Sequence, residues 1–260
     1  MSGNAKRIAV ITGASGGLGK EFVKQVIDDV DEIWAVGRNV EKLEGLKSEF
    51  GSKIVPLQMD LSDAKSLSKL SKKIEAEEKK SSIQIHWLIN NAGAGRFGAS
   101  KDFTTEEISV SITTHCTAIA AICNICIPCM KAGDHIVNVS SQSAFSPLPY
   151  MNLYAATKAF VYSYTRALGE ELRDTGIVVT AVCPGWIQTA LLPDTLNGRK
   201  VKFPLIVTAD KVAEKAIKDA RRGKPLSVYR FAVRLVAWLQ RHTSNDFSVK
   251  FWAKSVKKYL

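Results

Sequence analysis

Short apolar runs rich in Val and Ile alternate with longer stretches of mixed polar and apolar residues along most of the chain. The runs predict strands at residues 7–11, 32–36, 53–58, 85–89, 134–139 and 177–182. The stretches between them predict helices at 17–29, 62–80, 105–130 and 150–174, with Ser62 as an N-cap and Gly176 ending the last helix. Strands that are apolar throughout are typical of parallel sheets covered on both faces. We therefore expect an α/β fold with a doubly wound parallel sheet flanked by helices, and ligands at the carboxyl ends of its strands.

Length and composition fit one large domain. The chain has 260 residues, of which 46% are hydrophobic and 23% are charged, as in ordinary globular proteins. The N-terminus carries no signal-peptide apolar region, and we find no uncharged apolar run approaching the roughly 20 residues that cross a bilayer. We therefore expect a cytoplasmic protein.

Three of the five cysteines, Cys123, Cys126 and Cys129, form a C-x-x-C-x-x-C run. The run lies in an expected helix with Ala and Ile, where cysteine behaves as a small apolar residue. No second cysteine cluster completes a four-thiolate site, so we expect no metal. An odd number of cysteines without a secretion signal fits a reducing compartment.

The net charge of +11 is concentrated at the end of the chain. Residues 221–260 hold ten Lys and Arg against one acid, Asp246, so this tail carries +9 and the other 220 residues carry +2. No nucleic-acid module is recognisable in the sequence, and we do not expect nucleic acid as a partner.

The tail contains two amphipathic stretches. In residues 228–241, Arg230, Arg234 and Arg241 fall on one helical face. In residues 246–260, Lys250, Lys254, Lys257 and Lys258 are expected on one face, opposite Phe251, Trp252, Val256, Tyr259 and Leu260. Basic amphipathic helices of this kind lie on anionic bilayers, pack on a partner subunit or cap a site, and the sequence leaves these alternatives open.

A glycine-rich turn, Thr12-Gly13-Ala14-Ser15-Gly16-Gly17-Leu18-Gly19, lies between the first strand and the first helix. A bound pyrophosphate needs close backbone approach, free amide donors and a helix N-terminus, which this segment supplies. A tight turn without a ligand is the alternative.

Arg38 follows the second expected strand, at the place where many dinucleotide-binding folds carry an acidic residue that accepts hydrogen bonds from the adenosine ribose. A guanidinium suits a ribose 2′-phosphate better than a free hydroxyl. The sequence therefore favours NADP(H) over NAD(H). The alternative is that Arg38 is only a solvated cation in a loop.

Further motifs follow in order along the chain: Asp60-Leu61, Asn90-Asn91-Ala92-Gly93, Ser141 thirteen residues before Tyr154, Tyr154-x-x-x-Lys158, and Pro184-Gly185 with Thr189 four residues later. With these and the glycine-rich turn, the chain resembles the short-chain dehydrogenase/reductase family over about residues 6–189. The resemblance implies a Rossmann-type fold and an enzyme that interconverts a carbonyl and an alcohol with a nicotinamide cofactor.

Tyr154 and Lys158 are four residues apart, so they share one face of a helix. A free phenol has a pKa near 10, and a neighbouring ammonium should lower that pKa toward the range useful for general acid–base catalysis. Ser141 would donate a hydrogen bond to the substrate oxygen. The resemblance adds that Lys158 binds the nicotinamide ribose and that hydride passes between nicotinamide C4 and the carbonyl carbon.

The resemblance also implies a set of cofactor contacts. Asp60 and Leu61 would border the adenine, Asn91 and Gly93 the adenosine ribose, and Ile187 and Thr189 the nicotinamide carboxamide and a phosphate. The full expected set is Gly13, Ser15, Gly16, Gly17, Leu18, Gly19, Arg38, Asp60, Leu61, Asn91, Ala92, Gly93, Tyr154, Lys158, Pro184, Gly185, Ile187 and Thr189.

One position departs from the family pattern. Family members usually carry an Asn in the long fourth helix that joins a water to the catalytic Lys, and alignment places His115 there. Imidazole can also hydrogen-bond water and pass a proton near neutral pH. We hypothesise that His115 replaces the Asn in a proton relay, with a structural helix histidine or a one-turn misalignment as the alternatives.

The family's substrate-covering segment corresponds to residues 186–207, which include Leu191, Leu192, Phe203, Leu205 and Ile206. These residues predict a hydrophobic substrate such as a steroid, an acyl chain or an aromatic ketone, unless they only pack on the core. We expect residues 1–225 to form the catalytic domain and residues 226–260 a basic helical extension of it.

The sequence therefore predicts an NADP(H)-dependent oxidoreductase with a small-molecule carbonyl or alcohol substrate, acting as a homodimer or homotetramer. The alternative is a catalytically weak NADP(H)-binding redox sensor or scaffold, which the missing Asn favours and the triad of Ser141, Tyr154 and Lys158 opposes.

Overall fold

A computed structural model describes residues 5–189, 192, 195–196, 198–201, 203–242 and 245–256. Its centre is a seven-stranded sheet with the order β11-β6-β5-β4-β1-β2-β3, in which every neighbouring pair is parallel. The strands are β1 (Lys6–Thr12), β2 (Glu32–Gly37), β3 (Ile54–Gln58), β4 (Ile83–Asn90), β5 (His135–Val139), β6 (Val178–Val182) and β11 (Leu226–Ser227). The predicted fold class is confirmed, and the short β11 is an edge strand that the apolar pattern did not predict.

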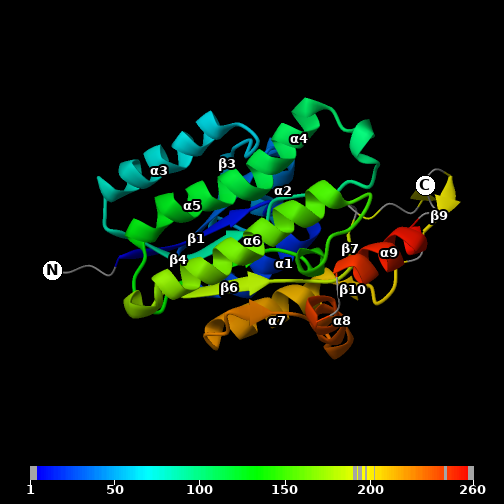
Figure 1. The fold of residues 1–260 in the computed structure, drawn as a ribbon. Coiled ribbons are helices and arrows are strands. Elements are labelled where there is room, and N and C mark those ends of the chain that lie inside the picture. The colour runs from blue at the N-terminus through cyan, green and yellow to red at the C-terminus, as the bar shows by residue number, and fades with distance from the viewer. Residues whose placement is uncertain are drawn as a thin grey trace.

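Helices cover both faces of the sheet (Figure 1). On one face lie α1 (Gly17–Val26), α2 (Val40–Phe50) and α7 (Ala209–Arg221); on the other lie α3 (Ser68–Glu78), α5 (Ala118–Cys126) and α6 (Asn152–Glu171). Strand β1 shows why its residues are all apolar. Ala9 and Ile11 belong to the first core, and Ile8 and Val10 belong to the second, because successive side chains point to opposite faces.

The helix expected at 62–80 begins later than the sequence predicted. A 3-10 turn (Ala64–Leu67) precedes α3, and Asp63 caps it by accepting a hydrogen bond from the Lys65 amide at 2.9 Å. The prediction of Ser62 as N-cap is wrong, because its hydroxyl donates to Asp60 at 2.7 Å instead. Helices α2 and α7 were not predicted.

The long helix expected at 105–130 consists of α4 (Thr105–Ile112), a π-helical turn (Thr113–Thr117), α5 and a closing 3-10 turn (Ile127–Cys129). Its 25 residues, Thr105–Cys129, are long and apolar enough to cross a membrane, which corrects the expectation that no such run exists. However, Ile119, Ile122 and Cys126 are fully or almost fully buried in the core on the face of the sheet that α3, α5 and α6 cover. In this fold the helix covers the sheet.

All five cysteines are free thiols. Burial raises the pKa of Cys123 to about 12 and that of Cys129 to about 11, so both are inert thiols at neutral pH. Among the residues that the structure describes, no three His, Cys, Asp or Glu side chains form a group that could hold a metal ion.

Two helices follow β11 at the end of the chain, α8 (Phe231–His242) and α9 (Asn245–Val256). They lie at the end of the molecule toward which the β6 arrow points (Figure 1). Two small sheets lie in the segment between β6 and α7: β7 (Ile187–Gln188) pairs with β10 (Val207–Thr208), and β8 (Thr195–Leu196) pairs with β9 (Arg199–Lys200). The extension therefore lies at the carboxyl ends of the central strands, where the sequence places the ligand site.

Candidate active site

The glycine-rich turn after β1 is closed by backbone contacts that only glycine permits. Gly13 has a φ of +64°, in the left-handed region that favours glycine. A Cβ on Gly19 would lie 2.0 Å from the carbonyl oxygen of Gly13, so a side chain there would break the turn. The first amides of α1 emerge at this turn without intrahelical acceptors, which makes it an anion-binding geometry.

Thr12 ties this turn to the loop after β4. Its hydroxyl oxygen accepts hydrogen bonds from the amides of Asn91 at 2.9 Å and Ala92 at 3.0 Å. The Asn91 side chain returns a bond to the Thr12 carbonyl at 3.1 Å. The predicted cofactor loop at 91–93 therefore lies directly beside the glycine turn, and Thr12, which is buried, is the positioning residue that the sequence analysis had no reason to single out.

The loop after β6 reaches the same place. A Cβ on Gly17 would come 3.3 Å from the Thr189 methyl group, so Thr189 lies over the start of α1. Further back in this loop, the Gln142 amide donates to the Pro184 carbonyl at 2.8 Å. Residues 184–189 thus connect the turn to the loop that carries Ser141.

Arg38 and Asp60 stand at the ends of β2 and β3, and both are exposed. The Asp60 carboxylate accepts hydrogen bonds from the Ser62 amide and hydroxyl, and these, with the charge of Arg38, hold the pKa of Asp60 below its usual value. Asp60 therefore stays ionised, and Arg38 presents a guanidinium at the end of the neighbouring strand β2.

Ser141, Tyr154 and Lys158 meet at the carboxyl end of β5. Tyr154 and Ser141 form a side-chain hydrogen bond. The Lys158 ammonium lies 5.7 Å from the centre of the Tyr154 ring and donates to the Val139 carbonyl at 2.9 Å. Only 4% of Lys158 is exposed, and the Ser140 hydroxyl fixes its backbone by donating to its carbonyl at 2.7 Å.

Burial controls the titration of this group. Burial raises the pKa of Tyr154, and the hydrogen bond with Ser141 offsets only part of that rise. Burial also lowers the pKa of Lys158 from 10.5 to about 8. The sequence predicted a lowered pKa for Tyr154. That prediction is wrong for the protein chain by itself, because the cost of burying the phenolate outweighs the interactions that stabilise it.

His115 occupies the π-helical turn and is almost fully buried, with 2% of its surface exposed. Its Nδ1 faces the hydroxyls of Thr157, at 3.3 Å, and Ser111, at 3.4 Å. Its ring meets the Tyr154 ring edge-on, with 6.0 Å between centres, and its buried Nε2 has no hydrogen-bond partner among the described residues. Burial, with a smaller contribution from the Lys158 charge, lowers the pKa of His115 to about 3, so the imidazole is neutral.

Aromatic side chains gather next to Tyr154. Trp186 and Phe203 from the predicted substrate segment lie 4.6 Å apart between ring centres, and Phe97 stacks on Trp186 at 6.1 Å. From α9, Trp252 also stacks on Trp186, with 6.4 Å between ring centres, and donates its indole N–H to the Pro149 carbonyl at 2.9 Å. Of the other apolar residues expected here, Leu191 lies outside the described residues, and Leu205 and Ile206 are exposed.

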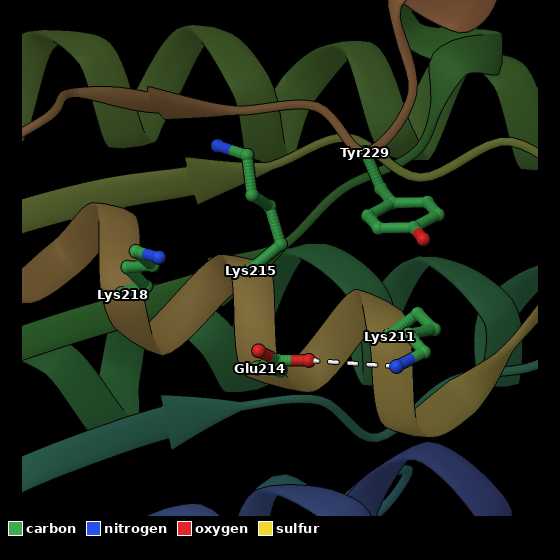
Figure 2. Close-up of a pocket in the computed structure, with 5 residues that line it drawn as sticks. All are labelled: Lys211, Glu214, Lys215, Lys218 and Tyr229. Carbon is green, nitrogen blue, oxygen red and sulfur yellow. Dashed lines mark ion pairs between the residues drawn. The ribbon is translucent and has the colours of Figure 1, made fainter.

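A shallow cavity of about 300 Å³ lies away from this site, between α7 and the segment after β11. Figure 2 shows its lining, which consists of Lys211, Glu214, Lys215, Lys218 and Tyr229. Lys211 pairs with Glu214 at 3.9 Å, and Lys215 pairs with the buried Asp219. None of the predicted site residues lines this cavity, and both ion pairs join residues within α7.

Comparison with known proteins agrees with this geometry. The profile of the short chain dehydrogenase family matches residues 7–199, and the chain belongs to this family of oxidoreductases. An uncharacterised oxidoreductase of Staphylococcus saprophyticus is 28% identical over 233 residues, covering 88% of this chain and 97% of the relative.

Two solved structures are similar over most of the chain. A short-chain dehydrogenase from Sphingobium yanoikuyae in complex with NADPH shares 27% identity at a TM-score of 0.75, covering 89% of this chain and 92% of the other. The 3-ketoacyl-(acyl-carrier-protein) reductase from Brucella melitensis complexed with NADH shares 25% identity at a TM-score of 0.71, covering 85% and 95%.

Proposed function

We propose that this protein is an NADP(H)-dependent oxidoreductase that interconverts a hydrophobic ketone or aldehyde and the corresponding alcohol. The observation that carries the proposal is the grouping of Ser141, Tyr154 and the buried Lys158 at the carboxyl end of β5, beside a glycine turn that opens the N-terminus of α1.

The residues present fit a dinucleotide. The amides at the start of α1, from Gly17 to Gly19, would hold the pyrophosphate, with Gly13, Ser15 and Gly16 forming the turn. Asp60, Leu61 and residues 91–93 would border the adenosine half, and Tyr154, Lys158 and residues 184–189 the nicotinamide half. Similar proteins bind NADPH in one case and NADH in another, so the preference for NADP(H) rests on Arg38, whose exposed guanidinium suits a 2′-phosphate.

The cofactor, when bound, supplies a hydride to the carbonyl carbon during reduction. Tyr154 donates the proton that the carbonyl oxygen receives, and Ser141 donates a hydrogen bond to the same oxygen. The raised pKa of Tyr154 keeps the phenol protonated at neutral pH, which suits a proton donor. The Lys158 ammonium then stabilises the phenolate that remains, and alcohol oxidation runs through the same positions in reverse.

We further propose that His115 connects this phenolate to solvent through hydrogen bonds. Because its pKa is about 3, the imidazole remains neutral, and it would accept a proton at one nitrogen only as it releases one at the other. The Thr157 and Ser111 hydroxyls at Nδ1 are the partners for such a relay.

The aromatic lining supports an apolar substrate. Trp186, Phe203 and Phe97 surround the approach to Tyr154, and Trp252 from the extension covers it. We assign residues 1–225 to the catalytic domain and residues 226–260 to its extension. A homodimer or homotetramer in the cytoplasm fits the family and the five free thiols.

The test uses the purified protein with NADPH and a panel of steroid, aromatic and long-chain ketones. We expect NADPH oxidation with at least one ketone, and a loss of about 10³-fold in kcat for Tyr154→Phe with unchanged NADPH binding. Tyr162→Phe, eight residues along the same helix, is the matched control and should retain activity. Binding of NADPH without turnover of any ketone would instead indicate a redox sensor or scaffold.

The preference for NADP(H) over NAD(H) is tested by a separate binding experiment. Arg38→Ala should weaken NADPH binding by about 10- to 100-fold and leave NADH binding within about twofold, because a charge-assisted bond to the 2′-phosphate is lost. Arg222→Ala, another exposed cation, is the control. An equal loss for both cofactors would refute the role of Arg38.

A further inference from the structure

Helix α8 exposes an apolar face. Its exposed large side chains are Phe231 (76% exposed), Leu235 (45%), Trp238 (54%) and Leu239 (44%). Leu235 follows Phe231 by four residues, and Trp238 and Leu239 follow Leu235 by three and four, so all of them lie on one side of the helix. The opposite side packs inward, with Val233 and Ala237 buried in a cluster with Phe145. Val233 and Ala237 therefore anchor α8 on the domain, while the large side chains of the apolar face stay exposed.

Helix α9 repeats this arrangement. Phe247 and Phe251 are 62% and 68% exposed, and their rings stack with 6.3 Å between centres. Trp252 and Val256 lie on the inward side. The sequence pattern placed Phe251 with Trp252 on one face, and the structure corrects this, because Phe251 lies outside among the lysines.

Exposed cations flank both apolar faces. Arg230 and Arg234 are exposed beside the α8 face, and Lys250 and Lys254 are exposed beside the α9 face. Residues 221–260 carry +9, with Asp246 as their single acid. A large apolar surface bordered by charges of one sign marks an interaction site on a protein of this size.

We propose that the outer faces of α8 and α9 bind the surface of an anionic lipid bilayer. The aromatic rings would insert at the headgroup level, and the four cations would pair with anionic headgroups. A second copy of the same surface fits less well, because it would bring positive charges against positive charges. Both helices lie at the end of the sheet that carries the candidate active site (Figure 1). Because Trp252 and Tyr154 pack against the same buried cluster, binding of α9 to a bilayer would bring the membrane surface close to that site.

The experiment measures co-sedimentation of the full chain with vesicles, and it needs no turnover, so it is independent of the proposed reaction. We expect binding to vesicles of phosphatidylcholine with 30% phosphatidylserine, and at least tenfold weaker binding to phosphatidylcholine alone. Binding to the anionic vesicles should also fall at 0.5 M salt.

Two double variants separate the apolar and charged contributions. Phe247→Ser/Phe251→Ser should lower partitioning about tenfold or more, and Lys250→Glu/Lys254→Glu should do the same. Lys72→Glu/Lys79→Glu makes the identical change of charge on exposed positions of α3 and its end, and should bind like the wild type within about twofold. Thermal unfolding temperature and NADPH binding, measured in parallel, verify that each variant is folded.

Three results would overturn the proposal: no sedimentation with anionic vesicles, equal loss in the α3 control, or phenylalanine variants that change only the oligomeric state. The last result would identify the surface as a contact between copies of this chain.

Discussion

The imidazole of His115 lies directly against the backbone of Gly93, so that a Cβ built on Gly93 would come within 2.4 Å of Nε2. Gly93 has a φ of +149°, a conformation that side chains disfavour. This contact joins the loop predicted to border the cofactor to the residue predicted to relay protons. Movement of one must therefore move the other.

Replacement of Gly93 tests this contact. Gly93→Ala should destabilise the fold by about 3 kcal/mol through overlap with the imidazole and unfavourable φ. In the Gly93→Ala/His115→Ala double variant the overlap disappears, so the two effects should be less than additive when measured by urea denaturation. Gly45→Ala is the control, because no atom lies within 4 Å of its Cβ, and on an exposed helix position it should stabilise by up to about 1 kcal/mol. Strict additivity of the two substitutions would show that the contact carries no energy.

His115 also predicts acid sensitivity. Its pKa of about 3 lies below the ordinary 6.5, so between these values the unfolded chain binds a proton that the folded chain does not. Stability should consequently fall as the pH drops through this window, at up to about 1.4 kcal/mol per pH unit from this group. His115→Asn, which cannot titrate, should show a shallower loss between pH 6.5 and 4 in urea denaturation. Parallel curves for the two proteins would contradict a buried neutral imidazole.

The same variant tests the relay. If His115 passes protons, His115→Asn should alter the pH dependence of kcat while leaving NADPH binding unchanged, and His115→Ala should lower kcat further than His115→Asn. Equal kcat values at every pH would leave His115 a structural role only.

The sequence predicted the strands well, because buried parallel strands such as β1 must be apolar on both faces. Such a strand appears as a short continuous run of apolar residues, which can be recognised from the local sequence. The sequence did not predict α2, whose apolar face is narrow, or α7, whose buried residues include three alanines and the charged Asp219. In α2 only Leu43 and Leu46 are buried, among six polar or charged positions and a glycine. It also missed the π-helical turn at Thr113–Thr117, because a change in helical hydrogen bonding leaves no compositional signal.

The candidate site was predictable where spacing fixes geometry, as for Tyr154 and Lys158 on one helical face. The desolvation that raises the pKa of Tyr154 was not predictable, because burial depends on everything that packs around a side chain. Nor was the docking of Trp252, which lies 103 residues beyond the Pro149 carbonyl that it binds. Contacts across such separations follow from the tertiary fold.

Lys158 predicts a conflict between stability and activity. Its pKa of about 8 shows that burial disfavours the ammonium in the folded protein. The unfolded chain therefore holds more protons between pH 8 and 10.5, and stability should rise with pH across that window. Lys158→Met should raise the free energy of unfolding at pH 7 by about 2 kcal/mol and abolish turnover, with the stability gain shrinking as the pH rises above 8. Lys72→Met, at an exposed position, should change neither property, and a destabilised Lys158→Met protein would show that its bond to the Val139 carbonyl outweighs the desolvation.

Trp252 predicts that the C-terminal extension contributes to substrate selection. Its indole is fixed by the bond to the Pro149 carbonyl and stacks on Trp186, and it packs against the same buried cluster as Tyr154. We therefore expect Trp252 to form part of a cover over the substrate. Trp252→Ala should raise KM for bulky aromatic ketones about tenfold, because loss of an aromatic contact removes about 1 to 3 kcal/mol of binding free energy. For a small ketone that does not reach the cover, KM should change by less than about twofold. Phe251→Ala, at the neighbouring but outward-facing position, is the matched control and should leave both values unchanged. If Trp252→Ala lowered kcat equally for every ketone with no effect on KM, the extension would act on the catalytic group itself, and its role as a substrate cover would have to be abandoned.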